Sequence, residues 1–226
     1  MAKNFRKWIV LSFFFTVGLP GFAETAPTDR VEPSLQITVR IYEYVQVRGR
    51  TLEGAKREAT KVLRKAGVET VWLDCYGTDS QQAPGCKQSL GQTDLVLRIV
   101  RPSKEARAAL RHNTCGLAVL PKNGGGGTYA TIFYDCLEEV AKAQRLPQRL
   151  ILGHTLVHEI GHLLLGSTRH SRQGIMRAVL SSNDWDLAGM GALRFTPRQA
   201  KQLRAEVLAR STQQGAAQIS RLASPK

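Results

Sequence analysis

Residues 148–176 read QRLILGHTLVHEIGHLLLGSTRHSRQGIM, and this stretch decides the fold. Residues 148–165 are almost wholly apolar outside the His and Glu positions, and Gly166 follows them directly. A long apolar run that stops at a glycine predicts a helix with the glycine at its C-terminal end. Because a helix that is apolar on every side is usually buried, we expect this helix to lie in the core.

The motif His158-Glu159-Ile160-Gly161-His162 stands within this helix and has the pattern H-E-x-x-H. Two histidines four residues apart share one helical face, so both imidazoles can reach a single Zn²⁺, with Glu159 beside the open side of the metal. Imidazoles and a carboxylate are costly to bury in an apolar helix without a partner, and a dication supplies that partner. The motif therefore predicts a zinc site.

A hydrolytic zinc site has three protein ligands and an open fourth position, so a third ligand is needed. Gly166 ends the helix soon after the motif, and His170 follows four residues later, where the chain can return over the metal. We therefore predict His170 as the third ligand. A carboxylate from Asp184 or Asp186 is an alternative, and so is His154, which lies one turn before the motif on the same helical face.

The chain before this helix alternates between strand and helix signals. Residues 35–42 alternate between apolar and polar side chains, which is typical of a half-buried strand. Thr51 is the predicted N-cap of a helix to Lys65, with Gly67 at its end. Further strands are expected at 68–76, 94–100, 115–120 and 129–134, and further helices at 137–144 and 196–210. The remaining segments are a short helix or basic loop at 102–111, a mobile glycine-rich connection at 123–127 and an irregular stretch at 167–194.

These features resemble the metzincin clan of zinc endopeptidases, in particular its matrixin-like branch. The residues that carry the resemblance are His158, Glu159, His162, Gly166, His170 and Met176. The resemblance implies an α+β zincin fold with a small, twisted mixed sheet, an active-site helix, a Met-turn at Met176 and a C-terminal helix. It also implies that the edge strand that lines the cleft and pairs with extended substrate is formed by Gly116, Leu117, Ala118 and Val119.

The sequence departs from the usual pattern of the clan in two places. Three residues separate His162 from Gly166 and three more separate Gly166 from His170, which makes the ligand loop two residues longer than usual. In addition, no tyrosine follows Met176, where some members of the clan have one close to the metal. We therefore assign no such tyrosine to this chain.

The resemblance implies a secreted zinc endopeptidase. If His158, His162 and His170 hold Zn²⁺, the metal would lower the pKa of a bound water towards about 7, and Glu159 would take the proton of that water as it attacks a peptide carbonyl. Glu159 would then deliver the proton to the leaving amine, whereas Met176 would have no chemical step. The expected partner is a protein or peptide substrate, and we expect the enzyme to be a monomer.

Two other functions fit the sequence. One is a zinc amidase that acts on cell-wall amides, because no residue decides the substrate class. The other is a secreted cationic binding protein with a structural metal site. It is motivated by 32 Lys and Arg against 18 Asp and Glu, an excess that suits an anionic surface or polymer. Export and the lack of interleaved aromatic residues argue against nucleic acid as a partner.

The N-terminus has the features of a signal peptide. Basic residues precede the apolar run 8–19, and Gly21-Phe22-Ala23 supplies a small-residue cleavage site, so we expect cleavage after Ala23. The run is shorter than the roughly 20 residues that span a bilayer, so an uncleaved anchor is the lesser alternative and no stable membrane insertion is expected. Cleavage removes three positive charges and no negative one, which lowers the formal net charge from +14 to +11.

The domain organisation follows from the length of 226 residues, 42% of them hydrophobic and 22% charged, which excludes disordered and multi-span membrane classes. After the signal peptide (1–23), we expect a flexible leader (24–34), one catalytic domain (35–210) and a loose C-terminal tail (211–226). The mature protein is expected outside the cell or in the periplasm.

The cysteines support export. Cys75, Cys86, Cys115 and Cys136 form an even set, which predicts two disulfides in an oxidising compartment. Three pairings are possible, and short loops between strand ends favour Cys75–Cys86 and Cys115–Cys136. None of the cysteines lies in a C-x-x-C arrangement, so we do not expect them to bind zinc.

Overall fold

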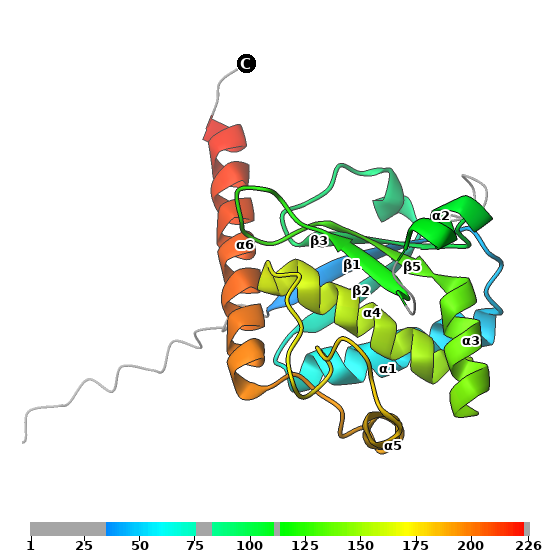
Figure 1. Cartoon of the computed structure of the whole chain (residues 1–226). Helices are drawn as coiled ribbons and strands as arrows, with labels where there is room; N and C mark the ends of the chain where they lie inside the picture. Colours follow the sequence, from blue (N-terminus) through cyan, green and yellow to red (C-terminus); the bar gives the residue numbers. More distant parts are fainter. Residues whose placement is uncertain (1–34, 76–82, 111–113, 224–226) are drawn as a thin grey trace, which may run out of the picture. The chain divides into compact units, whose positions relative to one another are not determined.

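The computed structural model describes residues 35–75, 83–110 and 114–223, which Figure 1 draws in colour. The signal peptide and the leader predicted from the sequence lie outside the described residues. Within the described parts of the chain, no helix is both long enough and apolar enough to cross a membrane.

A five-stranded mixed sheet forms the centre of the fold. Its strands are β1 (Gln36–Glu43), β2 (Glu69–Asp74), β3 (Asp94–Val100), β4 (Gly116–Val119) and β5 (Tyr129–Phe133). Their order across the sheet is β2-β1-β3-β5-β4. The first four in this order run parallel to their neighbours, and β4 pairs antiparallel with β5 at one edge. The mixed sheet that the sequence predicts is therefore present.

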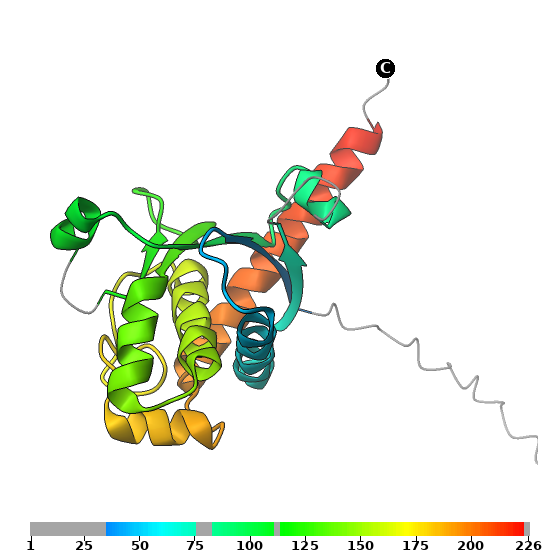
Figure 2. The same ribbon diagram turned by 90° about the vertical axis from the view of Figure 1, so that its right-hand side faces the viewer.

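Helices α1 (Gly49–Lys65) and α4 (Gln148–Leu165) pack on one face of this sheet, and α3 (Tyr134–Gln144), α5 (Ser182–Gly189) and α6 (Pro197–Ala223) contact α4. The remaining helices are α2 (Lys104–Ala109) and a 3-10 helix, η1 (Pro84–Lys87). Figures 1 and 2 show α1 and α4 side by side against the sheet. Buried residues occupy nearly the whole length of α4, as its apolar sequence predicts.

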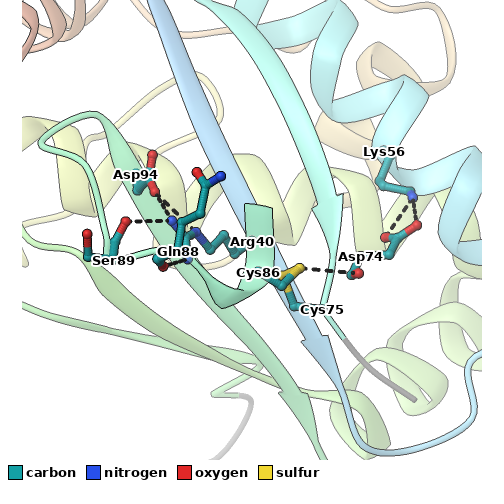
Figure 3. Close-up of a disulfide and its surroundings, with 8 residues drawn as sticks. All are labelled: Arg40, Lys56, Asp74, Cys75, Cys86, Gln88, Ser89 and Asp94. Carbon is teal, nitrogen blue, oxygen red and sulfur yellow. Dashed lines mark hydrogen bonds and ion pairs between the residues drawn. A yellow bond between two sulfur atoms is a disulfide. The ribbon is translucent and has the colours of Figure 1, made fainter. Parts of the chain in front are cut away.

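The alternation of side chains along β1 separates its two faces. The residues that face the helices are 0% exposed: Ile37, Val39 and Ile41. Arg40 points to the opposite face. There its guanidinium donates to the Asp94 carboxylate and to the carbonyl oxygens of Gln88 and Ser89, as Figure 3 shows. The segment after η1 is therefore held over that face of the sheet by a buried cation.

Both disulfides that the sequence favours are formed. Cys75–Cys86 joins the end of β2 to η1 (Figure 3). Near it, Lys56 of α1 pairs with Asp74, the last residue of β2. Cys115–Cys136 joins the residue before β4 to α3. The second bridge therefore fixes the start of the edge strand.

Two predicted boundaries in the first half of the chain need revision. α1 begins at Gly49 with Arg48 as its N-cap, so Thr51 is not the cap. The backbone N–H of Thr51 already donates to the carbonyl of Arg48, which places Thr51 within the first helical turn. The segment 102–111, left open between helix and loop, contains α2, and Ser103 caps it by accepting from the Ala106 N–H.

The second half of the chain contains more helix than predicted. Residues 167–194 were expected to be irregular but contain α5, which begins with a capping box between Ser181 and Asp184. Eight residues hold too few apolar positions to show a helical period. α6 continues to Ala223, so the loose tail predicted for 211–226 is wrong for 211–223. Alanine and glutamine recur there, and the sequence has no apolar stripe that would predict the helix.

Candidate metal centre

The end of α4 turns the chain back towards the H-E-x-x-H motif. Gly166 has left-handed dihedral angles (φ 59°, ψ 31°), a conformation that glycine adopts without strain. A Cβ atom on Gly166 would also lie 2.7 Å from the carbonyl oxygen of Gly125. Both the backbone conformation and the available space therefore require glycine where the ligand loop begins.

The turn brings His170 to His158 and His162. Their candidate ligand nitrogens all lie within 4.8 Å of one another. The ring centroids are 4.7 Å apart for His158 and His162, 5.3 Å for His158 and His170, and 4.9 Å for His162 and His170. His162 is buried, His158 is half-buried and His170 is exposed. The structure thus assembles a group that can hold a metal ion from two helical residues and one loop residue.

Backbone carbonyls fix the tautomers of the two helical histidines. His158 Nδ1 lies 2.8 Å from the oxygen of Ile175, and His162 Nδ1 lies 2.6 Å from the oxygen of Ser167. A carbonyl oxygen only accepts, so each neutral imidazole carries its proton on Nδ1. The two Nε2 atoms, 3.0 Å apart, then present lone pairs to each other. A cation fits between them, and a set of three imidazoles suits zinc.

Burial keeps these imidazoles in the form that binds metal. Burial, and to a smaller extent charge on His162 and His170, lowers the pKa of His158 from 6.5 to about 4. Burial also lowers the pKa values of His162 and His170. Because only neutral imidazole binds a metal ion, no proton has to leave an Nε2 atom at neutral pH.

Glu159 is a buried carboxylate beside this group. Glu159 is 4% exposed, and its Oε2 atom has no hydrogen-bond partner among the described residues. Burial raises the pKa of Glu159 from 4.5 to about 8, although a hydrogen bond from the backbone N–H of Ala118 opposes the rise. An ionised carboxylate here needs a nearby cation. Glu159 and the histidines therefore favour the same partner.

Met176 lies directly beneath the motif. It is 1% exposed, and a Cβ atom on Gly161 would lie 2.5 Å from its sulfur and 2.9 Å from the ring of Phe195. The Ser171 N–H donates to the Met176 carbonyl over 2.8 Å, which closes the turn that carries Ile175. Glycine within the motif thus leaves room for Met176.

The two aspartates considered as third ligands are placed differently. Asp184 is buried at the start of α5, where its carboxylate accepts from the Ser181 N–H and lies 3.3 Å from the Arg177 guanidinium. These contacts lower the pKa of Asp184 against the opposing effect of desolvation. Asp186 is exposed. Neither belongs to the group of converging metal-binding atoms in the described chain.

His154 is also outside that group and lies in the core, 2% exposed. Its Nδ1 is 2.9 Å from the carbonyl oxygen of Leu150, and its ring meets Trp185 of α5 edge to face with centroids 6.1 Å apart. Its Nε2 has no partner among the described residues. Burial lowers the pKa of His154, so the ring is neutral.

A cavity of about 650 Å³ opens beside the three histidines. Its walls come from β4, α3, α4, α5 and the segment after Met176, and the histidines, Glu159 and Trp185 line it. β4 forms the edge of the sheet, as the resemblance implies. Leu117 and Val119 are 50% and 56% exposed, whereas Gly116 and Ala118 are half-buried. Gly116, Leu117 and Ala118 line the cavity.

Several parts of this site leave no motif in the sequence. The carbonyl oxygens of Ser167 and Ile175 orient the helical histidines, but main-chain acceptors have no side-chain signature. Trp185 reaches the cavity because α5 forms. The capping box between Ser181 and Asp184 was the available signal for that helix.

Comparisons with known proteins add little to these observations. No protein-family model matches the chain, and no curated protein matches it. Among solved structures, the archaemetzincin of Methanopyrus kandleri matches with a TM-score of 0.45 and 14% sequence identity, over 78% of this chain and 98% of that one. We therefore base the function on the histidines, Glu159 and the cavity.

Proposed function

We propose that this chain is a secreted zinc-dependent endopeptidase of the metzincin type. The observation that carries the proposal is the meeting of three imidazoles, with ligand nitrogens within 4.8 Å of one another, and a buried carboxylate at one cavity. Zinc-dependent peptide hydrolysis uses a metal ion as Lewis acid, a proton acceptor beside it and room for an extended chain. Each of these requirements has a counterpart here.

His158, His162 and His170 would hold the zinc ion, which when bound lowers the pKa of water towards about 7 and polarises a carbonyl oxygen. Glu159 would serve as general base and then as general acid, taking a proton from the attacking water and passing it to the leaving amine. The N–H of Ala118 holds the carboxylate at the strand, on the cavity side. Glu159 would thus carry out both proton transfers from one position beside β4.

Met176 would support the site by packing and take no chemical step. It fills the space that Gly161 leaves beneath the motif, and its turn carries the Ile175 carbonyl that orients His158. We assign this turn as the Met-turn of the fold.

The substrate we propose is an unfolded protein or peptide bound along β4. Because β4 is an edge strand, its outer backbone groups are available to pair with an extended chain. The residues that would offer this pairing are Gly116, Leu117, Ala118 and Val119. Such pairing presents a peptide bond next to the histidines, since β4 lines the same cavity.

We further propose that the mature enzyme works outside the cytoplasm, with residues 35–210 as its catalytic domain. Both disulfides support this placement, because such bridges persist mainly in oxidising compartments. The basic run and apolar stretch before Ala23 support export.

The proposal is tested with the mature chain, residues 24–226, and a reduced, alkylated protein as substrate. We expect cleavage that a chelator abolishes and added zinc restores. Glu159→Gln should lower kcat by about 10²–10⁴-fold, since the amide cannot accept a proton. Glu69→Gln is the matched control and should retain full activity. Glu69 is an exposed carboxylate on β2 that pairs with Arg64 of α1. Undiminished cleavage by Glu159→Gln would refute Glu159 as the base.

A further inference from the structure

Gly116, the first residue of β4, lies against the side chain of Glu159. A Cβ atom built on Gly116 would be 2.6 Å from Cδ and 2.7 Å from Cγ of Glu159, and closer still to Oε1. Ordinary contacts of a Cβ atom begin near 3.4 Å. The three nearest heavy atoms all belong to Glu159. The Glu159 carboxylate therefore occupies the space that a side chain at position 116 would fill.

The backbone of Gly116 does not itself require glycine. Gly116 is absent from the glycines with positive φ, and it pairs with Ile132 as a regular antiparallel strand residue. Glycine is unfavourable in a strand, because it gives up more conformational freedom and offers no side chain to pack. A glycine in a regular strand often marks a close approach by another group, and here that group is Glu159.

The rest of β4 holds the same carboxylate from a fixed position. Ala118 also lines the cavity, and its backbone N–H forms a hydrogen bond to the Glu159 carboxylate. The strand is anchored just before Gly116 by the Cys115–Cys136 disulfide and by the hydrogen bond from the Phe133 N–H to the Cys115 carbonyl, 2.9 Å long. The edge strand therefore contacts Glu159 through the backbone of Gly116, where no side chain intervenes, and supplies one hydrogen-bond donor from Ala118.

We propose that Gly116 is a positioning residue for Glu159, which rests on the proposed peptidase function. Its lack of a side chain lets the carboxylate lie flat on the edge strand, beside the histidines and within the substrate cavity. Any larger residue at position 116 displaces the carboxylate by about 1 Å, a displacement that costs on the order of 10²-fold in rate. The same strand thus both aligns the substrate and sets the place of the general base.

The kinetic test compares Gly116→Ala with the unchanged mature enzyme loaded with zinc. We expect kcat to fall about 100-fold and KM to change by less than about threefold, because the backbone edge of β4 that pairs with substrate is kept. Gly49→Ala, where a Cβ atom would meet nothing within 4 Å, is the open control. Gly85→Ala, where a Cβ atom would crowd Leu73 far along the sequence from the site, is the crowded control. Both controls should keep their kcat.

A second readout does not depend on activity. We expect Gly116→Ala to lower the midpoint of thermal unfolding by about 3–10 °C, as overpacking in a buried site does. In a Glu159→Ala background the crowding partner is gone, so Gly116→Ala should then shift the midpoint by less than about 1 °C. If the single variant fails to fold, recovery of folding in the double variant gives the same support.

Three results would overturn the proposal: an unchanged kcat in Gly116→Ala, an equal loss of thermal stability with and without Glu159, or failure of both the single and the double variant to fold. Failure of the peptidase function is separate. It would appear as no cleavage by the unchanged enzyme, while the unfolding comparison would still decide whether Gly116 positions the carboxylate.

Discussion

At the scale of single residues, the titrating groups of the site shift in opposite directions for one reason. Burial lowers the pKa of His158 to about 4 and raises the pKa of Glu159 to about 8, since a buried site disfavours charge on either group. Neutral imidazoles are ready to bind a metal, whereas the neutral carboxyl is not ready to act as a base. A dication held by the histidines would favour the ionised form of Glu159, whereas the imidazoles are already neutral without it.

We expect Glu159 to destabilise the zinc-free protein as the pH rises from 6.5 to 8. Between those values Glu159 keeps its proton in the folded state, where its pKa is about 8, and has lost it in the unfolded state, where its pKa is near 4.5. Through this group the folded state binds more protons, so its contribution to the free energy of unfolding falls with pH by about 1–2 kcal/mol in this window. Urea denaturation in the presence of a chelator measures it.

The histidines act in the opposite direction. Their pKa values are lowered from 6.5, so they stabilise the folded state as the pH rises through 6.5, and this gain fades about one pH unit above that value. Because the histidines are the same in Glu159→Gln, the loss through Glu159 should appear as a fall in the stability of the unchanged protein relative to that variant between pH 6.5 and 8. A loss of equal size in that variant would show that another group causes it.

At the scale of elements, α4, α6 and the glycine-rich loop before β5 meet at Arg210. Arg210 is 8% exposed and donates to the carbonyl oxygens of Gly127, over 3.0 Å, and Leu163, over 3.4 Å. The Gly127 N–H also donates to Leu163. A side chain on Gly126 would collide with Arg210 and with Glu206 of α6. The end of the loop, expected from sequence to be mobile, is therefore packed between two helices.

Arg210→Ala should destabilise the protein by about 2–3 kcal/mol, because it removes the donor from two buried carbonyl oxygens. This corresponds to a thermal unfolding midpoint lower by roughly 5–10 °C. Arg198→Ala, an exposed arginine of the same helix, is the matched control and should change the midpoint by no more than about 2 °C. Equal shifts in the two variants would contradict the role assigned to Arg210.

The elements that sequence predicts well are those with local signals. The bounds of α4 are the predicted ones, because a continuous apolar run is followed by a glycine in the left-handed conformation. β3 also has its predicted bounds, since its apolar run is short and ends before Pro102. α5 and the far end of α6 were missed, because a short helix and a segment rich in alanine and glutamine lack the apolar period on which the prediction depends.

For the whole molecule, zinc should contribute to stability through the three histidines. Zinc at about 100 times its dissociation constant stabilises a protein by about 2.7 kcal/mol, which raises the unfolding midpoint by roughly 5–10 °C. His170→Ala should lose most of this rise. Asp184→Asn should keep the rise while lowering both midpoints, because it weakens the capping box of α5 and leaves the histidines intact. The reverse pattern would make Asp184 the third ligand.

The candidate site is predictable from sequence only as far as side chains reveal it. His158, Glu159 and His162 are set by helical spacing, and the structure places His170 beside them. The position of Glu159 against Gly116 depends on the contact between β4 and α4, which joins residues far apart in sequence. Such a contact has no local pattern and requires the folded chain.

The open edge of β4 has a consequence for the protein in solution. β4 has no neighbouring strand on its outer side among the described residues, and the exposed side chains of Leu117 and Val119 lie beside it, so an extended chain can join it there, including a second copy of this one. The formal net charge of +11 that remains after cleavage makes copies repel one another at low ionic strength. Salt screens this repulsion beyond about 10 Å at 0.1 M. The excess of lysine and arginine therefore keeps copies of the protein apart and keeps β4 free for substrate, and both effects weaken as salt is added.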